Sequence, residues 1–123
     1  MIRVLIIDDS TFVRQALTRM LASDPGIEVV GSASDGNEGH EKACALRPDV
    51  ITLDVKMPKI SGIQLKTYLH EKWPDMKFIF LTGHGSEQDY RAASSEAGVE
   101  YYLAKPVHID DLLKKMNQVF SKE

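Results

Sequence analysis

The chain has 123 residues, of which 43% are apolar and 27% charged, and its formal net charge is −3. This length suits one globular domain, and the mild acidity argues against direct binding to nucleic acid, which calls for a basic face. No apolar run reaches the roughly 18–20 residues of a membrane span. We therefore expect one domain over residues 1–123, located in the cytoplasm, with no nucleic-acid or membrane partner.

Short apolar runs alternate with helical spacing along the first half of the chain. Asp9 or Ser10 is expected to cap the first helix, because short polar side chains can accept hydrogen bonds from its free backbone N–H groups. The predicted elements are a strand over 3–7, a helix ending at Asp24-Pro25-Gly26, a strand over 27–30, a helix over about 38–46 and a buried strand ending at Asp54.

The same alternation continues in the second half. Ser61 and Gln64 have the spacing of a capping box, which predicts the start of a third helix that Pro74 stops. The remaining predicted elements are a strand over 77–82, a helix from about 86 to 98, a strand over 100–104 and a helix over 109–120. Five strands that alternate with five helices predict an α/β fold with a doubly wound parallel sheet.

Polar residues stand where the apolar strands end. They are Asp8 and Asp9 after the first strand, Asp54 at the end of the third, Thr82 at the end of the fourth and Lys105 after the fifth. In a parallel sheet these ends share one edge, where ligands bind in open α/β folds. Crowded carboxylates repel one another, and a divalent cation such as Mg²⁺ relieves the repulsion.

The hydroxyl and the ammonium at the same edge are suited to a phosphoryl group. Thr82 offers a hydrogen-bond donor and Lys105 a positive charge, while an aspartate such as Asp54 is a natural nucleophile. Taken alone, Asp8 and Asp9 could equally be a helix cap. Together with Asp54 and Lys105 they favour a metal-assisted site for phosphoryl chemistry.

The ordered motifs of the chain resemble those of a known family. They are VLIIDDS at 4–10, VITLDVKMP at 50–58, LTG at 81–83 and YYLAKP at 101–106. In this order and spacing the sequence resembles the CheY-like receiver domain of two-component response regulators over essentially its whole length. The resemblance implies a single receiver domain over 1–123, with a flavodoxin-like strand order of 2-1-3-4-5.

The resemblance also implies the site roles. Asp54 would accept a phosphoryl group from a histidine kinase or a histidine phosphotransfer protein. Asp9 would be a direct Mg²⁺ ligand, Asp8 would hold metal-bound water, and Asp54 with the backbone carbonyl of Lys56 would complete the protein ligands. The family usually has a cis peptide bond at Lys105-Pro106.

A switching mechanism follows from the same resemblance. Lys105 would pair first with Asp54 and then with the phosphate, and Thr82 would bond a phosphoryl oxygen. Tyr102 matches the switch aromatic that turns inward as Thr82 moves, although a tyrosine there could also simply pack. The face formed by the fourth helix, fifth strand and fifth helix would then change its affinity for a downstream protein. The domain would promote only its own phosphorylation and dephosphorylation, as a monomer or an activation-linked dimer.

Two other functions need weighing. Residues 23–31 and 50–58 look much like the receiver of the chemotaxis methylesterase, so the chain could be the receiver of a larger methylesterase-type or DNA-binding regulator. The second is a phosphatase of the haloacid dehalogenase type, which needs an aspartate two residues after its nucleophile on the first strand. Ser10 follows Asp8 at that spacing and Thr11 follows Asp9, so the pattern fails.

Overall fold

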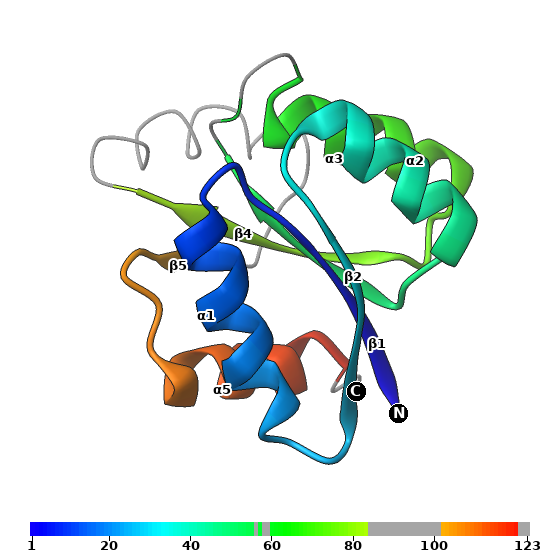
Figure 1. The fold of residues 1–123 in the computed structure, drawn as a ribbon. Coiled ribbons are helices and arrows are strands. Elements are labelled where there is room, and N and C mark those ends of the chain that lie inside the picture. The colour runs from blue at the N-terminus through cyan, green and yellow to red at the C-terminus, as the bar shows by residue number, and fades with distance from the viewer. Residues whose placement is uncertain (56, 58–59, 84–101, 121–123) are drawn as a thin grey trace.

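The computed structural model describes residues 1–55, 57, 60–83 and 102–120. Their strands form one parallel sheet in the order β2-β1-β3-β4-β5, which is the flavodoxin-like arrangement (Figure 1). The strands are β1 Ile2–Ile7, β2 Ile27–Ala33, β3 Val50–Asp54, β4 Lys77–Thr82 and β5 Tyr102–Ala104. The helices in this part of the chain are α1 Thr11–Ala22, α2 Gly36–Leu46, α3 Gly62–Lys72 and α5 Ile109–Phe120.

Helices cover both faces of the sheet, and each face has its own apolar core. On one face, alternate strand residues such as Val4, Ile6 and Val50 pack against α1 and α5. On the other face, Ile51 and Leu53 pack with residues of α2 and α3. Burial on both faces explains why the strands are continuous apolar runs rather than alternating ones.

The strand register brings the carboxyl ends of the strands to one edge. Ile7 in β1 is paired with Leu53 in β3, and Asp54 is paired with Leu81 in β4. Thr82 is in turn paired with Ala104 in β5. The residues that end or follow these strands are therefore neighbours across the sheet.

The helix starts agree with the predicted caps. Ser10 caps α1 by accepting a hydrogen bond from the Val13 N–H, which decides between Asp9 and Ser10. Ser61 and Gln64 form the predicted capping box at the start of α3. Local polar side chains thus set where both helices begin.

Several element bounds differ from the prediction, and β1 begins at Ile2 rather than Arg3. β2 was expected to end at Val30 but continues to Ala33, because a register shift between Val4 and Leu5 keeps it paired with β1. α2 begins at Gly36 rather than Glu38, since Asp35 caps it there.

The predicted fourth helix lies outside the described residues, so the count of five helices stays a prediction. Among the described residues, no helix has the length and apolarity to span a bilayer.

Candidate functional site

Three carboxylates meet at the carboxyl edge of the sheet. Asp8 directly follows β1 and is fully buried, and Asp54 ends β3 with 6% of its surface exposed. Asp9 is exposed, yet it offers an oxygen to the same group: one oxygen from each residue lies within 4.8 Å of the others. The structure therefore brings together the three acids that the sequence predicted would converge.

Lys105 lies opposite two of these acids. Its Nζ is 2.8 Å from Asp8 Oδ2 and 3.3 Å from Asp54 Oδ2. Burial lowers the pKa of Lys105, but the close ion pair with Asp8 and the charge of Asp54 raise it more, so its pKa lies above the ordinary value. The lysine is accordingly protonated at neutral pH. The expected contact with Asp54 is present, and the shorter contact is with Asp8, which the sequence did not indicate.

The loop after β1 holds Asp8 in place through several bonds. The backbone N–H of Asp8 donates to Ala33 O at 3.0 Å, which ties the residue to β2. The Ser10 N–H donates to Asp8 Oδ1 at 2.9 Å, while Lys105 takes the other carboxylate oxygen. Both oxygens of this buried carboxylate thus have a polar contact, as burial of a charge requires.

The backbone of Gly62, the first residue of α3, lies directly against the backbone of Asp54 and Val55. Its N–H donates to Val55 O at 3.0 Å, and a Cβ at this position would lie only 2.2 Å from the Asp54 carbonyl oxygen. No side chain fits at that separation without displacing α3 or the backbone of Asp54. The sequence shows a glycine here, but only the structure shows this close approach.

Thr82 and Lys105 are linked through the backbone of the neighbouring strands. Thr82 is buried, and its hydroxyl donates to Leu103 O at 3.5 Å, the limit for a hydrogen bond. The Lys105 N–H donates to Thr82 O at 2.8 Å. The peptide bond between Lys105 and Pro106 is cis, as the resemblance implied.

The side chain of Tyr102 and the whole of Lys56 lie outside the described part of the structure. Tyr102 lies in β5 and is paired with Phe80, but its side chain lies outside the described part of the structure. Lys56, whose carbonyl was expected to bind a metal ion, is itself outside the described residues. Their roles stay predictions.

The donor set at this edge fits a hard divalent cation. Mg²⁺ prefers oxygen ligands and usually takes one or two carboxylates together with water and phosphate oxygens. The oxygens of Asp8, Asp9 and Asp54 are close enough to hold such an ion jointly. The same arrangement of a carboxylate nucleophile beside an ammonium group is suited to phosphoryl transfer.

Comparisons with known proteins agree with this chemistry. The family model of the response regulator receiver domain matches residues 4–117. Response regulator GacA of Pseudomonas viridiflava is 38% identical over 121 residues, which cover 98% of this chain and 56% of GacA. Protein-glutamate methylesterase/protein-glutamine glutaminase 1 of Geobacter sulfurreducens is 43% identical over 108 residues, which cover 86% of this chain and 29% of that protein.

A solved structure extends the comparison to the fold. A chain of the CheX-CheY-BeF3-Mg²⁺ complex from Borrelia burgdorferi aligns with a TM-score of 0.87 at 28% identity, covering 98% of this chain and 90% of that chain. Against the curated relatives, the chain spans about half the length of GacA.

The Gly62 contact predicts a large effect of a single methyl group. Gly62→Ala should destabilise the protein by more than the roughly 1 kcal/mol expected for loss of the neighbouring cap in Ser61→Ala. Chemical denaturation of both variants measures this. Equal or smaller destabilisation by Gly62→Ala would show that the backbone of Asp54 is not held by this close approach.

The raised pKa of Lys105 predicts a pH-dependent contribution to stability. Its ion pairs stabilise the fold below the ordinary lysine pKa of 10.5, and this contribution is lost as the pH rises through the higher pKa of the folded state. In metal-free buffer, Lys105→Met should cost about 3 kcal/mol near neutral pH, because it removes a positive charge that contacts two buried carboxylates.

The measurement is the difference in unfolding free energy between wild type and Lys105→Met across alkaline pH. This difference should shrink above a pH of about 10.5, as the wild type loses the charge that the variant lacks. A difference that stays constant through that range would mean that the ammonium does not stabilise the pair of acids.

Proposed function

The chain belongs to the response regulator receiver family, and on that premise we propose that it is a phosphorylation-controlled switch with Asp54 as the phosphoryl acceptor. The observation that carries this proposal is the place of Asp54: a nearly buried carboxylate at the sheet edge, 3.3 Å from Lys105 Nζ and beside two further acids. A carboxylate oxygen of Asp54 forms the new bond to phosphorus. The bond between phosphorus and the imidazole nitrogen of a phosphohistidine donor breaks, and the imidazole leaves.

The acids around the acceptor form the proposed Mg²⁺ site. Asp8, Asp9 and Asp54 would hold the ion, and the Lys56 carbonyl joins them as a prediction from the family pattern. A bound Mg²⁺ supplies positive charge that offsets both the acids and the phosphoryl oxygens. The Borrelia burgdorferi relative was solved with Mg²⁺ and BeF3, which supports the same ion here.

Lys105 and Thr82 respond to the added charge. A phosphoryl group brings up to about two negative charges at neutral pH. Lys105, which already contacts Asp54, can follow the charge to a phosphoryl oxygen. Within the described residues, the Thr82 hydroxyl donates to Leu103 O at 3.5 Å, a long bond that it can exchange for one to the phosphoryl group.

The movement of Thr82 is the proposed link to partners. Tyr102 lies on the adjacent strand and would fill the space that Thr82 leaves. The face that includes the predicted fourth helix, β5 and α5 would then favour one partner-binding form. Local charge would thus bias a two-state element, which is how such switches act at a distance.

The partners and the wider protein belong to the same proposal. A histidine kinase or histidine phosphotransfer protein would phosphorylate Asp54, and an unidentified protein would bind the activated face. A stand-alone receiver and the receiver of a longer regulator both fit, since curated relatives such as GacA are about twice as long. The domain itself would regulate rather than turn over a substrate, in the cytoplasm and as a monomer or an activation-linked dimer. The family match does not favour the haloacid dehalogenase alternative.

Phosphoryl labelling tests the acceptor. With Mg²⁺ and acetyl phosphate, the wild-type protein should gain one phosphoryl group, and Asp54→Asn should gain none because the nucleophilic carboxylate is gone. Asp75→Asn, which changes an exposed aspartate just before β4, is the matched control and should label normally. Intact-protein mass spectrometry counts the groups, and undiminished labelling of Asp54→Asn would place the acceptor elsewhere.

A further inference from the structure

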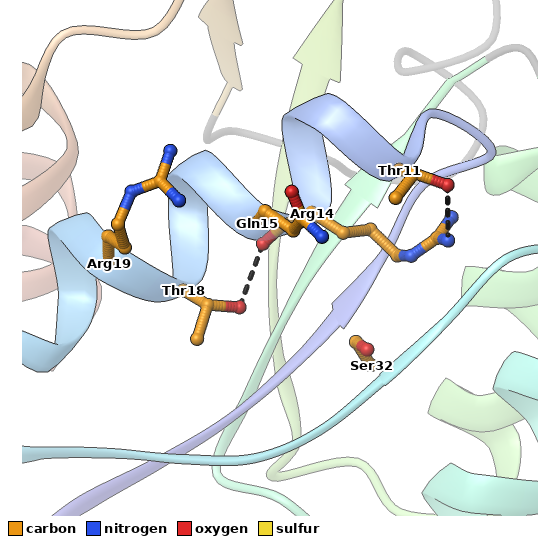
Figure 2. Close-up of a pocket in the computed structure, with 6 residues that line it drawn as sticks. All are labelled: Thr11, Arg14, Gln15, Thr18, Arg19 and Ser32. Atoms are coloured by element: carbon orange, nitrogen blue, oxygen red, sulfur yellow. Dashed lines mark hydrogen bonds between the residues drawn. The ribbon is translucent and has the colours of Figure 1, made fainter.

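Arg14 ties the first turn of α1 to the peptide bond that joins Asp8 and Asp9. Its Nη1 donates to the Asp8 carbonyl oxygen at 2.6 Å, and its Nη2 donates to Thr11 Oγ1 at 3.0 Å. Figure 2 shows the arginine side chain extended along α1 toward Thr11. None of the site roles discussed above uses this residue.

The hydrogen bond from Arg14 to the Asp8 carbonyl acts on the exposed part of the loop, where Asp9 follows Asp8. Asp8 is held in place without Arg14, by its backbone hydrogen bond to Ala33 and by the contacts of its carboxylate with Ser10 and Lys105. Asp9 comes next and is exposed. The Asp8 carbonyl and the Asp9 nitrogen belong to one planar peptide unit. A donor that holds this carbonyl therefore also restrains the position of the Asp9 Cα, from which the Asp9 side chain extends.

The Asp9 carboxylate needs such a restraint when no cation is bound. It lies within 4.8 Å of two other carboxylates, and like charges at this separation repel. An exposed side chain on a loop can relieve that repulsion by turning outward. A short hydrogen bond from a charged donor, which is stronger than one between neutral groups, opposes the turn of the peptide.

We propose that Arg14 is a positioning residue for the acidic site: by holding the Asp8–Asp9 peptide it keeps the Asp9 carboxylate turned toward Asp8 and Asp54, and so increases the affinity for Mg²⁺. Thr11 serves the same end by orienting the guanidinium. The inference rests on the proposed function in that it takes the acidic cluster to bind Mg²⁺.

The positive charge of Arg14 would lower the affinity for Mg²⁺, whereas its hydrogen bond would raise that affinity. A positive charge near the cluster disfavours a cation, so removal of the charge alone would tighten Mg²⁺ binding. Arg19 separates the two effects, because it lines the same groove of about 560 Å³ beside α1 and lies apart from Arg14 and Thr11 (Figure 2). Arg19→Met is therefore the matched charge control for Arg14→Met.

The experiment is a titration of the full chain with MgCl₂ at constant ionic strength, followed by the amide NMR signals of the loop after β1. Arg14→Met should weaken Mg²⁺ binding about tenfold, as loss of a residue that orients metal ligands typically does. Arg14→Lys, which keeps the charge but replaces the planar guanidinium fork with one ammonium group, should recover part of the affinity. Arg19→Met should bind as the wild type does or slightly more tightly.

A second comparison ties the effect to Asp9. In an Asp9→Asn background, which removes the charge that Arg14 is said to position, Arg14→Met should change Mg²⁺ affinity little further. An equal tenfold loss in that background would mean that Arg14 acts on the whole fold and would overturn the inference. Thermal unfolding of each variant identifies any that lose the fold, and Thr11→Val, expected to weaken binding a few-fold, then carries the test.

The results of these titrations separate the positioning role of Arg14 from the proposed Mg²⁺ site on which it depends. Wild-type affinity in Arg14→Met, or a gain equal to that in Arg19→Met, overturns the positioning role while Mg²⁺ binding itself stands. A wild-type protein that binds no Mg²⁺ overturns the metal site, and the inference with it.

Discussion

The ammonium group of Lys105 lies between two buried carboxylates, and the rest of the site depends on this contact. Asp8 and Asp54 end separate strands, and each would be costly to bury as an anion without a nearby positive charge. Lys105 follows a third strand, so one group of charges ties β1, β3 and β5 together at the same edge. The folded state therefore brings together the charges that the proposed phosphoryl chemistry would use.

The surrounding backbone leaves little freedom for the backbone of Asp54 to move. Gly62 approaches the Asp54 carbonyl so closely that a single methyl group would not fit. Thr82 is different, because the bond that its hydroxyl makes within the described residues, to Leu103 O, is long. The structure thus combines a tightly packed backbone at the proposed acceptor, Asp54, with a neighbour that can reorient, and a change of charge at Asp54 would act first on that neighbour.

The sequence predicted the features that local chemistry controls. Buried apolar strands, the caps at Ser10 and Ser61, and the meeting of Asp8, Asp9 and Asp54 all follow from patterns within a few residues or from the parallel order of the strands. The features it missed depend on pairing between distant segments. Gly31 and Ser32 look like strand breakers, yet β2 continues through them because β1 pairs with it there.

The role of Arg14 was hidden for the same reason. An arginine on the first turns of a helix is ordinarily a solvated charge, and nothing in its spacing shows that its guanidinium reaches back to the Asp8 carbonyl. The sequence likewise named Asp54 as the partner of Lys105 through a family pattern, and only the structure revealed the shorter contact to Asp8. Side-chain reach across a loop is a property of the folded chain.

The most direct measurement is to locate the phosphoryl group chemically. Borohydride reduces an aspartyl phosphate to homoserine, so treatment of the phosphorylated protein followed by peptide sequencing marks the acceptor. The account predicts homoserine at position 54 alone, and only when the donor and Mg²⁺ are both present. Homoserine at position 8 or 9, or modification at position 54 of equal extent in the presence of a metal chelator, would contradict it.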